Sequence, residues 1–313
     1  MRLLRAELAR LFGRRFAKVM FVSLVLALGV IAVVVAYNTH RPTAQDLRQA
    51  EAQAASDRQE CLAAQEHVPE SERWDCDRID ASHYLDYVLS FREQMPDLML
   101  GFGGLLALVG FLVGASFIGA EWSSGGMANL LLWRTRRVRV LLAKVGAMLL
   151  TLAFAGLVVG AAWVGTIWFV ASVRGVFGFL TPEFWISLGW DGVRSIGLAM
   201  ITAVIGMSVA SLGRRTAAAL GLLIGYLVVW ELGGRMVMYG LQVLAPERFM
   251  LSTYVAAWLT KKITVTDYEG CYSMECDPYE LLITWPWALA VLGALVALAL
   301  AVASWSIHRR DVA

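Results

Sequence analysis

Four lysines are the residues on which phosphate chemistry in this chain would depend: Lys18, Lys144, Lys261 and Lys262. An ATPase phosphate-binding loop places a glycine directly before its lysine, so that the backbone can wrap the phosphates. None of the four lysines follows a glycine. The chain is therefore predicted to lack an ATPase site and to bind no cofactor of its own.

Hydrolytic chemistry of other kinds also lacks its residues. The sequence contains no H-E-x-x-H zinc pair and no G-x-S-x-G nucleophile elbow, and its four histidines lie outside the apolar segments. We expect no catalytic residue. A membrane-embedded enzyme is the least favoured class of function.

The cysteines form two local pairs, Cys61 with Cys76 and Cys271 with Cys276. Both pairs fall in segments that we expect outside the membrane, where disulfides persist. Pairing between the two segments is an alternative. A metal site is another, with further ligands from His67, His83, Glu275 and Asp277, but the spacing matches no zinc pattern.

Charged residues are few within the apolar segments. Glu231 and Arg235 are four residues apart and can form an intramembrane ion pair on one helix face. Asp191 and Arg194 stand before another apolar segment. We interpret both as local ion pairs rather than as a proton or substrate relay, because no series of carboxylates crosses the apolar segments.

The elements that must position these residues are membrane-spanning helices. Apolar residues make up 58% of the chain, charged residues only 17%, and the mean hydropathy is +0.62, whereas soluble domains carry about a quarter charged residues. We expect an all-α polytopic protein with no nucleic-acid partner. The six predicted spans are 16–37, 98–119, 140–172, 196–212, 217–233 and 282–305.

Arginine-rich connections predict the orientation of these spans. Basic residues concentrate in 1–15, 120–139, 213–216 and 306–313, so these segments and both termini are expected in the cytoplasm of a multi-pass protein of the plasma (inner) membrane. The external segments are then 38–97, a small helical domain, 173–195, and 234–281, which we expect to hold broken helices and a disulfide loop.

The N-terminal segment is predicted to be an amphipathic helix in the membrane interface. Its apolar face carries Leu4, Leu8, Leu11 and Phe12, and Glu7 falls among the arginines on the other faces.

The connection between the second and third spans is the most informative stretch. Glu121 ends a span, Ser123 or Ser124 can cap a new helix, and Gly125 with Gly126 permits a sharp turn. Residues 127–133 then form a short apolar helix that needs a covering partner. The alternative is an interfacial hairpin held in the headgroups by tryptophans and arginines.

This connection resembles that of the ABC-2 exporter permeases, through Glu121, Gly125, the apolar helix, the arginines and Lys144. The amphipathic first helix and the six spans extend the resemblance along the chain, although the first external loop is larger than in the smallest family members. The resemblance implies that the short helix couples to a separate ATPase. The implied coupling residues are Glu121, Gly125, Met127, Leu130, Leu131, Arg134, Arg136 and Arg137.

The same resemblance implies the partners. Two ATPase subunits would bind ATP and magnesium, and a second permease copy, as a homodimer, would complete a substrate path within the lipid. The arginines of the connection can equally be a positive-inside anchor. A channel or an accessory membrane scaffold is the alternative function.

Overall fold

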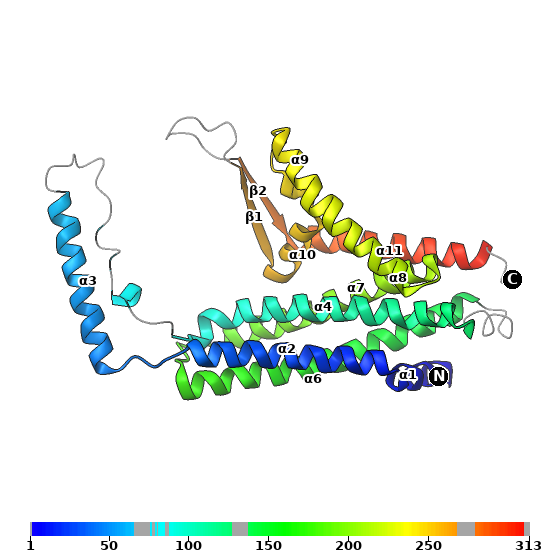
Figure 1. Ribbon diagram of the computed structural model, residues 1–313, viewed down its shortest axis with the longest axis horizontal. Helices are drawn as coiled ribbons and strands as arrows, with labels where there is room; N and C mark the ends of the chain where they lie inside the picture. The colour runs from blue at the N-terminus through cyan, green and yellow to red at the C-terminus, as the bar shows by residue number, and fades with distance from the viewer. Residues whose placement is uncertain are drawn as a thin grey trace. The chain divides into compact units, whose positions relative to one another are not determined.

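The computed structural model describes residues 2–65, 76, 79, 81–84, 88–126, 137–267 and 279–309, which are predominantly helical (Figure 1). Within these residues, six helices are long and apolar enough to cross a membrane. They are Arg15–Asn38, Phe91–Ser123, Arg139–Arg174, Pro182–Gly213, Thr216–Gly240 and Trp285–Ser306. The predicted helical, six-span architecture is confirmed at this level.

The chain divides into two compact units, which are described separately. Unit 1 comprises Met1–Ala27, Pro96–Ala161 and Trp185–Ala313, and unit 2 comprises Leu28–Met95 and Ala162–Phe184. Helices that pass from one unit to the other are α2 (Arg15–Asn38), α4 (Phe91–Ser123), α6 (Arg137–Arg174) and α7 (Pro182–Gly213). Unit 1 also contains the N-terminal helix α1 (Arg2–Gly13).

Small residues bring α4 and α7 into close contact in unit 1. A Cβ atom added at Gly110 would lie 2.6 Å from the carbonyl oxygen of Ala199, and one at Gly114 would lie 2.4 Å from that of Ala203. The Thr202 hydroxyl also donates a hydrogen bond to the Ala107 carbonyl at 2.7 Å. Glycines four residues apart permit this backbone approach, as in other membrane helix pairs.

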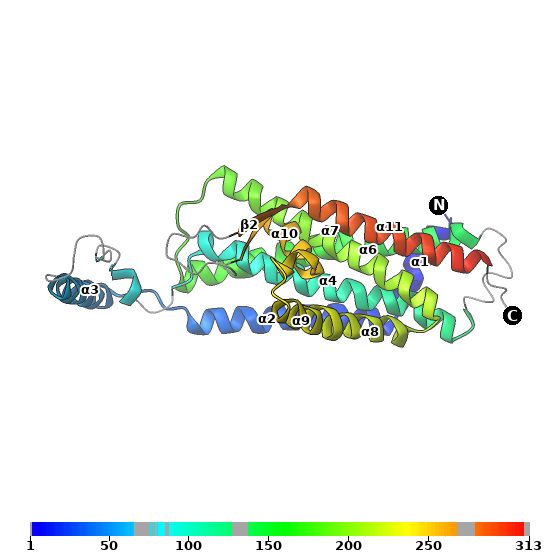
Figure 2. The same cartoon turned by 90° about the horizontal axis from the view of Figure 1, so that it is seen from above.

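The fifth span is wound in three parts that continue as one rod in Figures 1 and 2. It consists of α8 (Thr216–Gly225), the π-helix η4 (Tyr226–Gly234) and α9 (Arg235–Gly240). A π-helix of this length is uncommon, and π-turns concentrate at functional or strained positions.

Two short helices and a hairpin separate the fifth span from the last. These elements are η5 (Pro246–Phe249), α10 (Leu251–Thr260), β1 (Lys262–Asp267) and β2 (Tyr279–Thr284), followed by α11 (Trp285–Arg309). The strands pair antiparallel, with Lys262 opposite Thr284 and Asp267 opposite Tyr279. Val265 and Ile283 are buried against Ala257 of α10 and Ala288 of α11. The hairpin is therefore packed on the end of the last span.

Two features of the fold differ from the sequence-based expectation. Only broken helices and a loop were expected over 234–281, but alternating β-branched residues such as Ile263 and Val265 form a half-buried strand. The fourth span was expected from residue 196, but α7 begins at Pro182. Proline fits the first turn of a helix, and the helix continues through Trp185 and Trp190.

Unit 2 contains the helix α3 (Ala44–Ala64), which lies within the segment 38–97 that we predicted to be a small helical domain. Thr43 and Asp46 form a capping box at its start. The backbone N–H of Thr43 donates a hydrogen bond to the Asp46 carboxylate, and the Thr43 hydroxyl donates a second one. These hydrogen bonds, chiefly the first, lower the pKa of Asp46. Later in that segment, the described helical residues are the short helix η3 (Ala81–Tyr84) and the start of α4.

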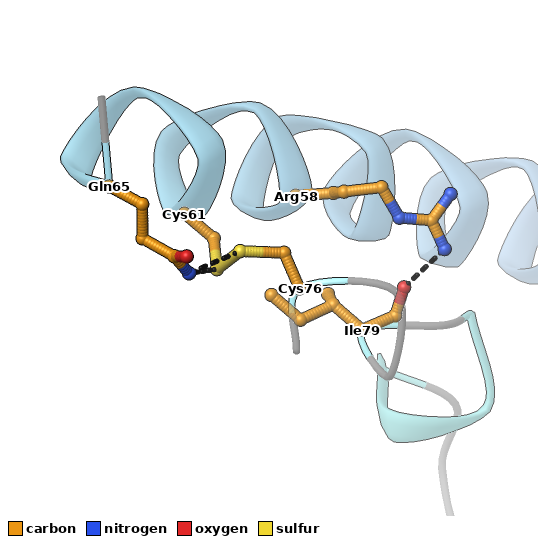
Figure 3. Close-up of a disulfide and its surroundings, with 5 residues drawn as sticks. All are labelled: Arg58, Cys61, Gln65, Cys76 and Ile79. Carbon is orange, nitrogen blue, oxygen red and sulfur yellow. Dashed lines mark hydrogen bonds between the residues drawn. A yellow bond between two sulfur atoms is a disulfide. The ribbon is translucent and has the colours of Figure 1, made fainter. Parts of the chain in front are cut away.

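A disulfide joins α3 to the segment that follows it (Figure 3). Cys61 and Cys76 are bonded, with Cα atoms 6.0 Å apart, so this predicted local pair is confirmed. Nearby, Arg58 donates a hydrogen bond to the Ile79 carbonyl at 2.7 Å, and the Tyr84 hydroxyl donates one to Asp57. The Asp57 carboxylate raises the pKa of Tyr84. Cys271 and Cys276 lie outside the described residues, so their pairing stays a prediction.

Glycine replacements on α4 should have opposite effects according to what faces them. Gly114→Ala should lower the thermal unfolding midpoint in detergent, because the new methyl group would collide with a backbone carbonyl that cannot move independently. Gly104→Ala on the same helix meets nothing within 4 Å and should be neutral or stabilising by up to about 1 kcal/mol. Equal midpoints for the two variants would contradict the close α4–α7 contact.

Peptide mapping of the unreduced protein should find Cys61 linked to Cys76 and Cys271 linked to Cys276. The first link closes a loop with a sequence separation of 15, which corresponds to about 3 kcal/mol of stabilisation of the local fold. Cys76→Ser should therefore increase proteolysis within α3. Links between the two pairs would disprove the local connectivity, and a reduced sample provides the reference digest.

Candidate functional site

A cluster of five charged side chains lies at the end of unit 1 that carries α1. Its members are Glu7, Arg10, Arg14, Glu121 and Lys144. Lys144 of α6 stands at its centre and is fully buried, as is Glu7 of α1. The Lys144 ammonium lies 2.6 Å from Glu7 and 2.7 Å from Glu121. Glu121 belongs to the last turn of α4, so this one cation joins three helices.

An arginine stands at each end of this ion cluster. Arg10 donates to the second oxygen of Glu7 at 2.8 Å, and Arg14 to the second oxygen of Glu121 at 2.7 Å. Arg14 also donates to the Ser116 carbonyl at 3.0 Å. Each carboxylate oxygen therefore faces one cation, and positive and negative charges alternate along the cluster.

The ring of Phe117 lies beneath two of the three cations, the central Lys144 and the terminal Arg14. The Lys144 ammonium lies 4.8 Å from the ring centroid, and the Arg14 guanidinium lies 4.9 Å from it. Cation–π attraction is strongest where the cation is desolvated, as Lys144 is here. Phe117 is itself fully buried.

Burial on α1 explains why the cluster forms there. Leu4 lies next to Gly146 of α6, and Leu11 is 1% exposed, so Leu4, Glu7 and Leu11 share one packed face at helical spacing. Phe12, which we expected on this apolar face, is 56% exposed. The expectation that Glu7 belongs with the exposed polar residues is therefore wrong, because its carboxylate is buried in an ion pair with Lys144.

The arrangement is suited to holding helices together rather than to catalysis. The two carboxylates are occupied by cations, and the cluster contains no histidine, cysteine or serine side chain as a nucleophile. Among the described residues, no group of three potential metal ligands is present. Removing one member of such a cluster leaves an uncompensated buried charge, which costs about 3–5 kcal/mol.

Glu121 and Gly125 are the two predicted coupling residues whose surroundings the structure describes. Helix α4 ends at Ser123, and Gly125 adopts φ +73°, a conformation that glycine enters without strain. Its N–H donates to the Trp122 carbonyl at 3.2 Å, which closes the helix. The expected sharp turn is present, directly after the ion cluster.

The remaining coupling residues of the prediction lie outside the described residues. These are Met127, Leu130, Leu131, Arg134 and Arg136. Arg137 opens α6, and its side chain is likewise not described. The short apolar helix over 127–133 therefore stays a prediction.

Among the described residues, no direct salt bridge joins Glu231 to Arg235, although the Arg235 charge interacts electrostatically with the Glu231 carboxylate. Glu231 instead accepts hydrogen bonds from the Tyr226 hydroxyl at 2.8 Å and from the backbone N–H and hydroxyl of Ser252 at 2.9 and 2.7 Å. The π-helix accounts for this, since its turn brings residue i+5 rather than i+4 alongside. By contrast, Asp191 and Arg194 form the expected local ion pair at 3.1 Å.

Glu7, Arg10 and Arg14 are the cluster residues that sequence analysis did not select, whereas Lys144 was named only as part of the family resemblance. One signal existed: Glu7 is the first acidic residue of the chain, and no other occurs before Asp46. Glu121 is similarly isolated between Asp97 and Glu183. No protein-family model matches this chain, and no curated protein matches it either.

Replacing Lys144 should destabilise the protein far more than replacing an exposed lysine. Lys144→Met leaves the buried Glu7 carboxylate and the partly buried Glu121 carboxylate without their shared cation, so the free energy of unfolding in mixed micelles should fall by about 3–5 kcal/mol. Lys18→Met, at an exposed position, should change it by less than about 0.5 kcal/mol. Adding Glu7→Gln to Lys144→Met should restore part of the loss, and the absence of any restoration would argue against the cluster.

Proposed function

We propose that this chain is the transmembrane permease of an ATP-driven exporter. Two copies would form the substrate path within the plasma membrane, and two separate ATPase subunits would bind ATP and magnesium. The proposal combines the resemblance of 119–144 to the ABC-2 permeases with the mechanical link that the ion cluster provides.

The observation that carries the proposal is that the ion cluster joins the two ends of the connection between the second and third spans. Glu121 lies just before the Gly125 turn, and Lys144 lies two helical turns after α6 begins at Arg137. The two ends of the connection are thus clamped to each other and, through Glu7, to α1. A partner that displaces the connection would move α1, α4 and α6 together.

Such a link is what coupling requires. ATP binding would draw the ATPase subunits together, the connections would follow, and the clamped helices would change the side on which the cavity opens. A switch of this kind works only if the partner binds the two arrangements with different affinity. A rigid, charge-locked junction transmits small displacements, because packed and ion-paired interfaces adopt discrete arrangements.

Orientation follows from the same residues. The arginine-rich segment 2–15 and the described ends of the connection, 120–126 and 137–139, belong to the α1 end of unit 1, and we propose that this end faces the cytoplasm. The segments with the cysteines would then lie outside, where a disulfide is stable.

A second permease copy would cover apolar surface that one copy leaves open. The first, fifth and sixth spans have only 22%, 11% and 17% of their most apolar windows buried. Side chains such as Val229, Met236 and Leu298 are more than half exposed. Lipid and a second copy are the partners that such faces require in a membrane.

The proposal can be tested by placing a charge within the connection. Leu130→Asp should leave the protein inserted and folded but weaken ATPase binding at least about 100-fold, because a buried unpaired charge costs several kcal/mol. Co-purification from native membranes with quantified ATPase stoichiometry is the measurement. A channel or scaffold would show no stoichiometric ATPase even in the wild-type protein.

Ser124→Asp is the matched control for this variant. Ser124 is exposed on the same connection, so the substitution adds the same charge without changing the apolar helix. It should bind the ATPase normally. If Leu130→Asp also retained normal binding and transport, the coupling assignment would be wrong; if both variants lost binding, the effect would come from charge alone.

A further inference from the structure

The opposite end of unit 1 contains a cavity of about 360 Å³ among α4, α7 and the end of α10. One part of its wall is apolar, from Met99, Leu100 and Leu259. Another part is polar, from Asp97, Ser187 and Lys261. Volumes of about 300–1,000 Å³ with a few convergent polar groups are typical of small-ligand sites.

The positive charge in this cavity is only partly neutralised. The Lys261 ammonium donates to the Ser187 hydroxyl at 2.6 Å and lies 3.8 Å from Asp191. Asp191 is already paired with Arg194 at 3.1 Å through the same oxygen. The Lys261 side chain is 43% exposed, so its ammonium can reach a further anion.

The carboxylate of Asp97 also lines this cavity and is not paired with Lys261. Asp97 is exposed, and it makes no hydrogen bond or ion pair with any other residue that the structure describes. Asp97 and Lys261 therefore line one cavity without neutralising each other. A ligand with both charges would satisfy them together.

The backbone at Lys261 adds an independent observation. Lys261 has φ +73° and ψ −37°, a region that non-glycine residues rarely occupy. Its carbonyl accepts a hydrogen bond from the Trp285 N–H at 2.8 Å, which fixes the residue between α10 and the last span. Strain of this kind concentrates at ligand sites, and here it fixes the backbone that carries the ammonium.

We propose that this cavity binds the phosphoethanolamine headgroup of a membrane lipid. The phosphate would take hydrogen bonds from Lys261 and Ser187, and the lipid ammonium would donate to Asp97. The apolar wall, with Leu100 37% exposed, would accommodate the start of the acyl chains. The proposal concerns this cavity alone and does not depend on the exporter assignment.

The chemistry distinguishes this headgroup from its neighbours. A choline headgroup has no N–H to donate to the Asp97 carboxylate, whereas an ethanolamine ammonium has three. A phosphatidylglycerol headgroup supplies the phosphate but no cation, which leaves Asp97 unpaired. Soluble phosphoethanolamine supplies both charges but gains nothing from the apolar wall.

Lipid-binding native mass spectrometry of the purified full chain tests the proposal. Dioleoyl phosphatidylethanolamine should bind at least about tenfold more tightly than the choline and glycerol lipids with the same acyl chains. Free phosphoethanolamine at millimolar concentration should not displace it. Equal affinity for the three lipids would overturn the headgroup assignment, and displacement by the free compound would overturn the lipid assignment.

Variants identify the residues responsible. Lys261→Asn and Asp97→Asn should each reduce phosphatidylethanolamine affinity about tenfold, as loss of a hydrogen bond to a charged group predicts. Asparagine tolerates positive φ, so Lys261→Asn should fold. Lys262→Asn and Glu93→Gln are exposed neighbours outside the cavity lining and should bind normally. Equal loss in these controls would disprove the site, and the lipid comparison on wild-type protein tests it without any variant.

Discussion

The buried ammonium of Lys144 is the constraint on which one end of the molecule depends. A fully buried cation is stable only where carboxylates compensate for its lost hydration. The only acidic residue near the start of the chain and the one at the end of α4 both meet it. Because these ion pairs are made between buried or partly buried groups, they hold α1 against α4 and α6.

The spans differ in how much of their apolar surface is buried within the protein. Helices α4 and α7 approach through small residues, and 61% and 50% of their most apolar windows are buried. In the fifth and sixth spans those fractions are 11% and 17%. Without a hydrophobic driving force inside lipid, such packing depends on shape and hydrogen bonds, so a closely packed pair of spans contrasts with spans whose surfaces are left open.

The two ends of unit 1 use charge differently. At the α1 end, each carboxylate oxygen faces a cation, and the cluster holds α1, α4 and α6 together. At the other end, Glu231 replaces a missing side-chain cap at the start of α10, while Lys261 and Asp97 keep unsatisfied charge at a cavity. The first arrangement suits the holding of helices against one another, and the second suits the binding of a charged ligand.

The sequence by itself determined the membrane spans and favoured the local disulfide. An apolar run of about 20 residues can satisfy its backbone only as a helix in lipid, and Cys61 and Cys76 are near neighbours in the chain. The turn at Gly125 was also predictable, because glycine readily adopts positive φ. Helix ends were less predictable, as Pro182 shows, because interfacial residues are compatible with helix or loop.

Only the tertiary structure decided which charges meet. Glu7 and Lys144 are 137 residues apart, and the amphipathic pattern placed Glu7 with the exposed arginines because hydropathy carries no information about a distant buried partner. Glu231 and Arg235 had the right spacing for an α-helix, but the local π winding changed the neighbour to Tyr226. Helical periodicity specifies faces, whereas partner choice depends on which faces are brought together by packing.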